Sequence, residues 1–96
     1  MRELVFMKRA LNAIYKVAQY RATEYYPETG EKFINEVFDF CEQYSKVRVV
    51  HPLCKNSTLS KHYYSCIVFK RKWVIAFKYS ETEFKVYRFI WGAKLK

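Results

Sequence analysis

The sequence is poor in the residues that break regular structure and in paired cysteines. It holds two glycines and two prolines, and neither Gly30 nor Gly92 belongs to a glycine-rich loop of the kind that cradles phosphate groups. Its three cysteines, Cys41, Cys54 and Cys66, are an odd number with no C-x-x-C pair. This pattern excludes a disulfide framework and a zinc ribbon, so Cys41 and Cys66 are expected to be small buried hydrophobic residues.

Long apolar runs are also absent. No stretch approaches the roughly 20 residues of a membrane span, and the first residues carry charges where a secretory signal needs an apolar stretch. We therefore expect a cytoplasmic protein with no membrane partner. Cys54, His62 and Cys66 lack the close ligand pairs of structural zinc sites, so no metal and no other cofactor is expected.

Acidic residues are scarce in the second half of the chain. Residues 1–49 hold eight Lys and Arg against seven Asp and Glu, whereas residues 50–96 hold ten against two. The composition is 51% hydrophobic and 20% aromatic, which indicates a folded chain, and 96 residues are expected to form one domain, 1–96. A basic surface on one side of such a domain indicates an anionic partner, either nucleic acid or an acidic protein segment.

Three apolar runs dominate the last third of the chain: Tyr63–Phe69, Trp73–Tyr79 and Phe84–Trp91. Each has the length of a strand and is rich in β-branched and aromatic residues. The polar breaks between them, Lys70–Lys72 and Ser80–Glu83, are too short for a crossover. The sequence therefore predicts a three-stranded antiparallel meander.

The preceding residues supply a cover for this sheet. Arg2–Met7 is a candidate first strand, and from about Lys8 apolar residues recur at helical spacing until Tyr25-Tyr26-Pro27 ends the helix. The polar side of that helix holds Arg9, Asn12, Lys16 and Gln19. Pro27 suits the first turn of a second helix that extends to about Gln43–Lys46, and Val47–Ser60 is expected to be a loop. The prediction is an α+β fold in the order β-α-α-β-β-β, a helical hairpin on a small antiparallel sheet whose edge the first strand joins.

This order, on a short chain with a basic sheet, resembles the RelE/ParE superfamily of bacterial type II toxin–antitoxin toxins. The segments that carry the resemblance cover most of the chain: Phe6-x-Lys8-Arg9-Ala10-Leu11, Ile14, a tyrosine and proline before the second helix, Glu31-Lys32-Phe33-Ile34, Lys72-Trp73-Val74-Ile75-Ala76-Phe77 and Phe89-Ile90-Trp91-Gly92. The resemblance implies a plasmid-stabilisation-type toxin that inhibits growth and is neutralised by a cognate antitoxin protein.

The resemblance also implies one of two targets. The RelE-like branch cuts mRNA on the ribosome and carries an arginine after the aromatic residue of the penultimate strand, where this chain has Val74. Lysines expected on the strand before it are replaced by Ser65 and Ile67, and after Gly92 only Lys94 supplies a cation near the expected place. The ParE-like branch lacks these residues and inhibits DNA gyrase. The residues thus favour a ParE-like inhibitor that is not an enzyme, with mRNA endoribonuclease activity and simple nucleic-acid binding as alternatives.

Two sets of candidate site residues follow. A rearranged cleavage site would use His62, Tyr63 and Lys94, because a histidine can exchange protons near neutral pH and a lysine can neutralise phosphate. The alternative is that His62 is a surface residue and that Tyr63 or Tyr64 packs under the helices. The residues expected to bind nucleic acid or a protein partner are basic: Lys61, Lys70, Arg71, Lys72, Arg88, Lys94 and Lys96. The Lys70–Lys72 turn could equally be a solvated hairpin tip.

Overall fold

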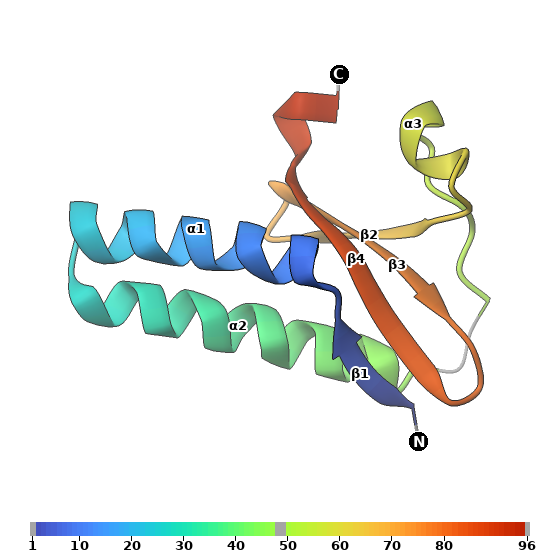
Figure 1. Cartoon of the computed structure of the whole chain (residues 1–96), viewed down its shortest axis with the longest axis horizontal. Helices are drawn as coiled ribbons and strands as arrows, with labels where there is room; N and C mark the ends of the chain where they lie inside the picture. The colour runs from blue at the N-terminus through green and yellow to red at the C-terminus, as the bar shows by residue number, and fades with distance from the viewer. Residues whose placement is uncertain (1, 48–49, 96) are drawn as a thin grey trace.

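The computed structural model describes residues 2–47 and 50–95 and confirms the predicted α+β fold. Its elements are β1 (Glu3–Phe6), α1 (Lys8–Glu24), α2 (Pro27–Ser45), α3 (Ser57–Ser60), β2 (Ser65–Phe69), β3 (Trp73–Tyr79), β4 (Glu83–Trp91) and a 3-10 helix, η1 (Gly92–Leu95). The two long helices form an antiparallel pair that packs against the sheet (Figure 1). Neither these helices nor α3 is long and apolar enough to cross a membrane.

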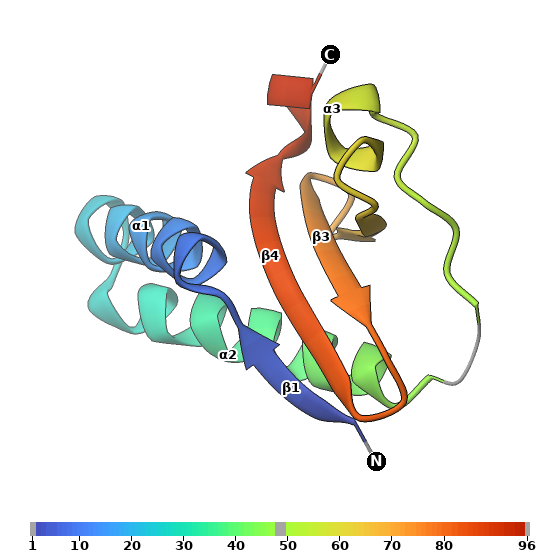
Figure 2. The same ribbon diagram turned by 45° about the vertical axis from the view of Figure 1, so that its right-hand side comes forward.

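The sheet has the strand order β1-β4-β3-β2. Figure 2 shows β1, β4 and β3 side by side from a turned view. The antiparallel pairs β2–β3 and β3–β4 confirm the predicted meander. The first strand joins the edge of the sheet as predicted, but β1 runs parallel to β4, with Glu3 opposite Glu83 and Phe6 opposite Val86, so the sheet is mixed and not the antiparallel sheet that was predicted. A parallel neighbour needs a long connection, and the helices and the other strands provide one.

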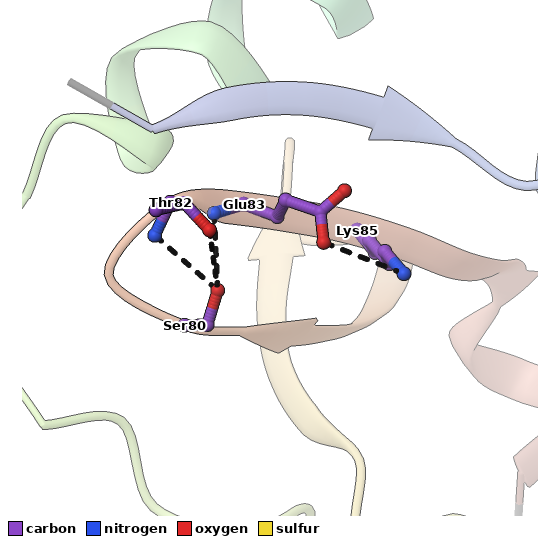
Figure 3. A network of polar contacts seen from close by, with 4 residues as sticks. All are labelled: Ser80, Thr82, Glu83 and Lys85. Atoms are coloured by element: carbon purple, nitrogen blue, oxygen red, sulfur yellow. Dashed lines mark hydrogen bonds and ion pairs between the residues drawn. The ribbon is translucent and has the colours of Figure 1, made fainter.

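The hairpin between β3 and β4 turns within the predicted polar break. The Ser80 hydroxyl oxygen accepts hydrogen bonds from the backbone N–H groups of Thr82, at 3.3 Å, and of Glu83, at 3.1 Å (Figure 3). At the start of β4, the Lys85 ammonium lies 3.6 Å from the Glu83 carboxylate. The serine thus satisfies two backbone donors that the turn leaves without a strand partner.

The first meander strand begins at Ser65, two residues later than predicted. The cause is Tyr63, whose φ of 63° lies in the left-handed region and is incompatible with a strand. Its backbone N–H donates to Ser60 O and that of Tyr64 donates to Leu59 O, at 2.9 and 3.4 Å. These two bonds form the Schellman motif that closes a helix C-terminus, here with a tyrosine in the position usually taken by glycine.

The short helix α3 lies inside Val47–Ser60, the segment predicted to be a loop. It forms because the Asn56 side chain accepts hydrogen bonds from the backbone N–H groups of Thr58 and Leu59, at 3.0 and 3.2 Å. The Asn56 amide also donates to Leu95 O at 3.0 Å, which ties α3 to η1. One turn of helix has no amphipathic period, so hydrophobic spacing could not show it.

The long helices have the predicted bounds, with Pro27 as the first residue of α2. They meet at Gly30, where an added Cβ would lie 2.5 Å from Ala18 O and 3.1 Å from Ala22 Cβ. The neighbouring Thr29 hydroxyl donates to Arg21 O at 2.9 Å. Glycine therefore allows the backbones of α1 and α2 to approach more closely than any other residue would.

Two hydrophobic clusters occupy the two faces of the sheet. The larger lies under the long helices and is made by Ala10, Ile14, Ala18, Phe33, Val37, Cys41, Ile67, Phe69, Ile75, Phe77, Phe84, Val86 and Phe89. The smaller lies on the opposite face, where Cys54, Leu59 and Ala76 are buried with Val74 and Ile90 packed beside them. The second face is thus partly covered by the segment that contains α3.

The cysteine pattern proved misleading. Cys54 and Cys66 form a disulfide with a Cα–Cα distance of 5.0 Å, so the expectation that no disulfide forms is wrong. An antiparallel bridge between Leu53 and Ser65 brings the two thiols together, and a C-x-x-C rule cannot detect this long-range pairing. Both sulfurs are used, which also removes them from any cluster with His62. Cys41 is buried as predicted, and burial raises the pKa of its thiol to about 12.

Candidate anion-binding pocket

A pocket of about 680 Å³ lies where α1, the end of β4 and η1 meet. The residues that give it its character are four cations, Arg9, Lys16, Arg88 and Lys94, and two tryptophans, Trp73 and Trp91. Arg88 and Lys94 were predicted as binding residues, and the pocket brings them together. Arg9, Lys16 and the tryptophans were not predicted as site residues.

The fold explains how these side chains converge. Arg9, Asn12 and Lys16 stand at i, i+3 and i+7 on α1 and therefore share one side of that helix. In β4 the register shifts so that Ala76 faces Arg88 while Phe77 faces Val86, which leaves a bulge just before Arg88. Bulges redirect neighbouring side chains. β1 pairs with β4 only as far as Val86, so beyond this point no strand covers that edge of β4.

Lys94 is placed by the close approach of Gly92 to the β2–β3 turn. The Gly92 N–H donates to Lys72 O at 2.7 Å, and a Cβ on Gly92 would lie 3.0 Å from the same oxygen. A side chain there would push the end of β4 away from the turn. Glycine thus sets the point where β4 ends and η1 begins.

The pocket is electrostatically unbalanced. Among residues 2–47 and 50–95 no carboxylate lines it, and the three ion pairs found there, Glu36–Lys70, Glu42–Lys46 and Glu83–Lys85, all lie elsewhere. Burial lowers the pKa of the Arg88 guanidinium, and repulsion from Arg9 lowers it further. An anion bound between these groups would relieve that repulsion.

The start of α1 adds to the positive potential. Met7, the N-cap, offers no side-chain hydrogen bond, and the first turn contains no acidic residue. It contains Lys8 and Arg9 instead, although the N-terminus of a helix is already the positive end of its dipole. This arrangement opposes the usual preference for acidic residues there, and such local conflicts are expected at functional sites.

Trp73 and Trp91 supply flat apolar surface beside the cations. Trp73 stacks on Phe89 with ring centroids 4.9 Å apart, and its buried indole Nε1–H has no hydrogen-bond acceptor among the described residues. Trp91 is 50% exposed. No histidine, tyrosine or carboxylate of the described residues lines the pocket. The arrangement therefore suits binding of an anion with a planar group and lacks the usual general acid–base pair.

The predicted basic turn is separate from this arrangement. Lys70 forms an ion pair with Glu36 of α2, and its ammonium lies 5.7 Å from the centre of the Phe69 ring. Lys70 and Arg71 both adopt left-handed backbone conformations, with φ of 51° and 62°. The side chains of Arg71 and Lys72 are exposed. The turn thus presents two exposed cations, while Lys70 is engaged with α2.

His62, Lys61 and Tyr63 lie in the segment between α3 and β2. The five residues of β2 separate them from the Lys70–Lys72 turn, roughly 17 Å at strand spacing, so His62 and the turn cannot form one small site. The His62 ring lies 5.8 Å from that of Tyr64. All three residues, Lys61, His62 and Tyr63, are exposed, and Lys96 lies outside the described residues.

Uncharged residues occupy the positions where the RelE-like resemblance implies cations. Val74 packs against the smaller hydrophobic cluster, and Ser65 and Ile67 are buried. The β2 residues that alternate with them, Cys66 and Val68, are likewise uncharged. β2 and the start of β3 therefore carry no cation toward either face of the sheet.

No protein-family model matches this chain, and a search of curated proteins finds no relative.

Proposed function

We propose that this protein is the toxin of a type II toxin–antitoxin pair, a ParE-like inhibitor of bacterial growth that binds DNA gyrase and does not cut RNA. The β-α-α-β-β-β order with its basic sheet half supports the superfamily. The observation that supports an inhibitor over a nuclease is the composition of the pocket, in which four cations form no ion pair and face no acid–base residue among the described parts of the chain.

The missing catalytic groups argue against RNA cleavage. Removing one well-placed charge donor from an active site typically lowers the rate by about 10²–10³. Val74, Ser65 and Ile67 occupy three places where the RelE-like branch has cations, so their combined effect should leave little cleavage. Binding to a large target needs only the exposed positive surface.

A cognate antitoxin would neutralise the protein by covering this surface with acidic and apolar groups. The site of action would be the bacterial cytoplasm, where glutathione and thioredoxin keep thiols reduced. There the working form would carry Cys54 and Cys66 as free thiols. If the purified protein does not bind the product of the adjacent open reading frame, the antitoxin part of the proposal is wrong.

The test is induced expression in a bacterial host, with DNA, RNA and protein synthesis followed in parallel. We expect growth to stop with an early loss of DNA synthesis, and the purified protein to inhibit gyrase supercoiling. The double variant Arg88→Gln/Lys94→Gln should lose both effects. Arg71→Gln/Lys72→Gln removes the same charge outside the pocket and should retain them. Normal growth on expression would contradict the proposal.

One observation favours a second candidate function, mRNA endoribonuclease. On the second face of the sheet, the Tyr64 ring lies 5.2 Å from that of Tyr87 and 5.8 Å from that of His62, and the Lys78 ammonium lies 5.4 Å from both tyrosine rings. This group contains a proton-transfer residue and a cation. Cut mRNA in arrested cells, lost in His62→Gln, would establish this candidate in place of gyrase inhibition.

A further inference from the structure

The pocket continues along α1 beyond Lys16. A second hollow of about 460 Å³ shares Lys16, Val17 and Trp73 with the first and extends to Tyr20, Arg21 and Tyr25. The two hollows together form one surface, the α1 groove. Five cations line it, Arg9, Lys16, Arg21, Arg88 and Lys94.

Aromatic side chains line the groove together with these cations. Trp73 lies where the two hollows join, Trp91 is its direct partner across the β3–β4 pair and lines the first hollow, and Tyr20 and Tyr25 line the second hollow. Tyr20 is 61% exposed and Tyr25 is 66% exposed, so both rings are accessible to a ligand. The Arg21 guanidinium lies 4.6 Å above the Phe33 ring and is thereby held at the groove wall.

We propose that the α1 groove binds single-stranded nucleic acid, with phosphates at the cations and bases stacked on the exposed rings. This inference goes beyond the proposed function, because it names a ligand of the protein itself and does not depend on gyrase being the target. Proteins that bind single strands combine a positive groove with aromatic platforms, since every base has a face that can stack.

The composition and size of the groove favour a single strand over other anions. A duplex keeps its bases stacked internally, so it could use the cations but not the rings. An acidic peptide would likewise leave Trp91 and Tyr25 without planar partners. The sixteen-residue step from Arg9 to Tyr25 spans about 24 Å of helix, which matches about seven nucleotides at stacked spacing.

The test is fluorescence anisotropy with labelled oligo(dT) and oligo(U) of about eight nucleotides, over a series of salt concentrations. Engagement of all five cations predicts a slope of log affinity against log salt of about −3.5. Arg9→Gln/Lys94→Gln should reduce the slope by about 1.4, whereas Arg71→Gln/Lys72→Gln, with the same charge change outside the groove, should leave it unchanged.

Stacking is tested with two neighbouring tyrosines. Tyr25 lines the groove and Tyr26 does not, although Tyr26 is 67% exposed, so Tyr25→Ala should weaken binding roughly tenfold or more and Tyr26→Ala should not. Tyr25→Phe keeps the ring and should retain affinity. Both residues are at the surface, and thermal unfolding of each variant verifies that it folds.

Besides the absence of oligonucleotide binding, three results would overturn the inference. The first is that a hairpin duplex of the same length binds with the same affinity as the single strand. The second is that Tyr25→Ala and Tyr26→Ala lose affinity equally. The third is that a glutamate-rich peptide displaces the oligonucleotide and binds Tyr25→Ala with the same affinity as the unsubstituted protein. Growth arrest without oligonucleotide binding would refute this inference and leave the toxin proposal standing. Oligonucleotide binding without growth arrest would do the reverse.

Discussion

Replacing Gly30 by alanine tests the packing of the two long helices. In an ordinary helix this change is favourable, because alanine is better than glycine by about 1 kcal/mol. At Gly30 the new Cβ would lie 2.5 Å from the carbonyl oxygen of Ala18, whereas ordinary contacts begin at 3.4 Å. The helices would have to separate by about 0.9 Å at this point.

The packing cost should exceed the gain in helix propensity. Overpacking a well-packed site costs about 1–3 kcal/mol, and the obstacle is backbone, which cannot rotate away as a side chain can. Separation of the helices would also weaken the bond from Thr29 to Arg21 O, worth about 1 kcal/mol. We therefore expect Gly30→Ala to lower the free energy of unfolding by about 1–3 kcal/mol.

Thermal unfolding followed by circular dichroism measures this change. For a domain of this size each kcal/mol corresponds to about 4–8 °C, so the melting temperature should fall by roughly 4–24 °C. Asn35→Ala is the matched control, because Asn35 is exposed on the same helix and should gain a few tenths of a kcal/mol. A rise in melting temperature for Gly30→Ala would refute the close contact between α1 and α2.

Three further predictions concern stability. Reduction of the Cys54–Cys66 disulfide, which links residues 12 apart, should cost about 3 kcal/mol, and the reduced protein should melt at the temperature of the Cys54→Ser/Cys66→Ser variant and well below the oxidised protein. Arg71→Gly should raise the free energy of unfolding by about 0.5–1 kcal/mol, because Arg71 has a φ of 62°, which glycine adopts without strain. The urea midpoint should therefore rise, and a lower midpoint would contradict this. Burial, with a smaller effect of Arg2, lowers the pKa of His51 below 6.5, so the unfolded chain binds the proton first. Stability should be highest above about pH 6.5 and fall as the pH drops toward the folded pKa, and His51→Phe should flatten this dependence between about pH 7.5 and 5.5.

Local pattern was sufficient for most of the fold. The bounds of β3 were predicted without error because the charged turn before Trp73 and the polar turn after Tyr79 are both short. The break between α1 and α2 followed from Pro27, which limits the residue before it. Each of these features depends on residues a few positions apart.

The features that the sequence did not predict depend on distant residues. The parallel pairing of β1 with β4 joins residues 80 positions apart, from Glu3 to Glu83. The disulfide depends on the segment around Leu53 folding back onto Ser65. Propensity and periodicity describe neighbours in the chain and contain no information about these contacts.

The candidate site was predicted only in part, because its residues come together through contacts between distant parts of the chain. Arg88 and Lys94 were found because cations in or after a strand must face solvent or a partner. Arg9 and Lys16 were attributed to the solvated side of their helix. The sequence did contain a signal for a basic surface here, since Arg9 and Lys16 share one helix face with no acidic residue between them. Only the fold shows that this face adjoins Trp73.

The pairing of β1 with β4 has a consequence for how the protein is made. β1 leaves the ribosome early, yet its hydrogen-bonding partner is 80 residues further along the chain. At a synthesis rate of about 5–20 residues per second, the two strands are separated by roughly 4–16 seconds. During that interval α1 and α2 exist without Arg88 and Lys94, which form the opposite wall of the groove. For the growth inhibitor proposed above, this order of assembly means that the groove is complete only after β4 and η1 have been synthesised.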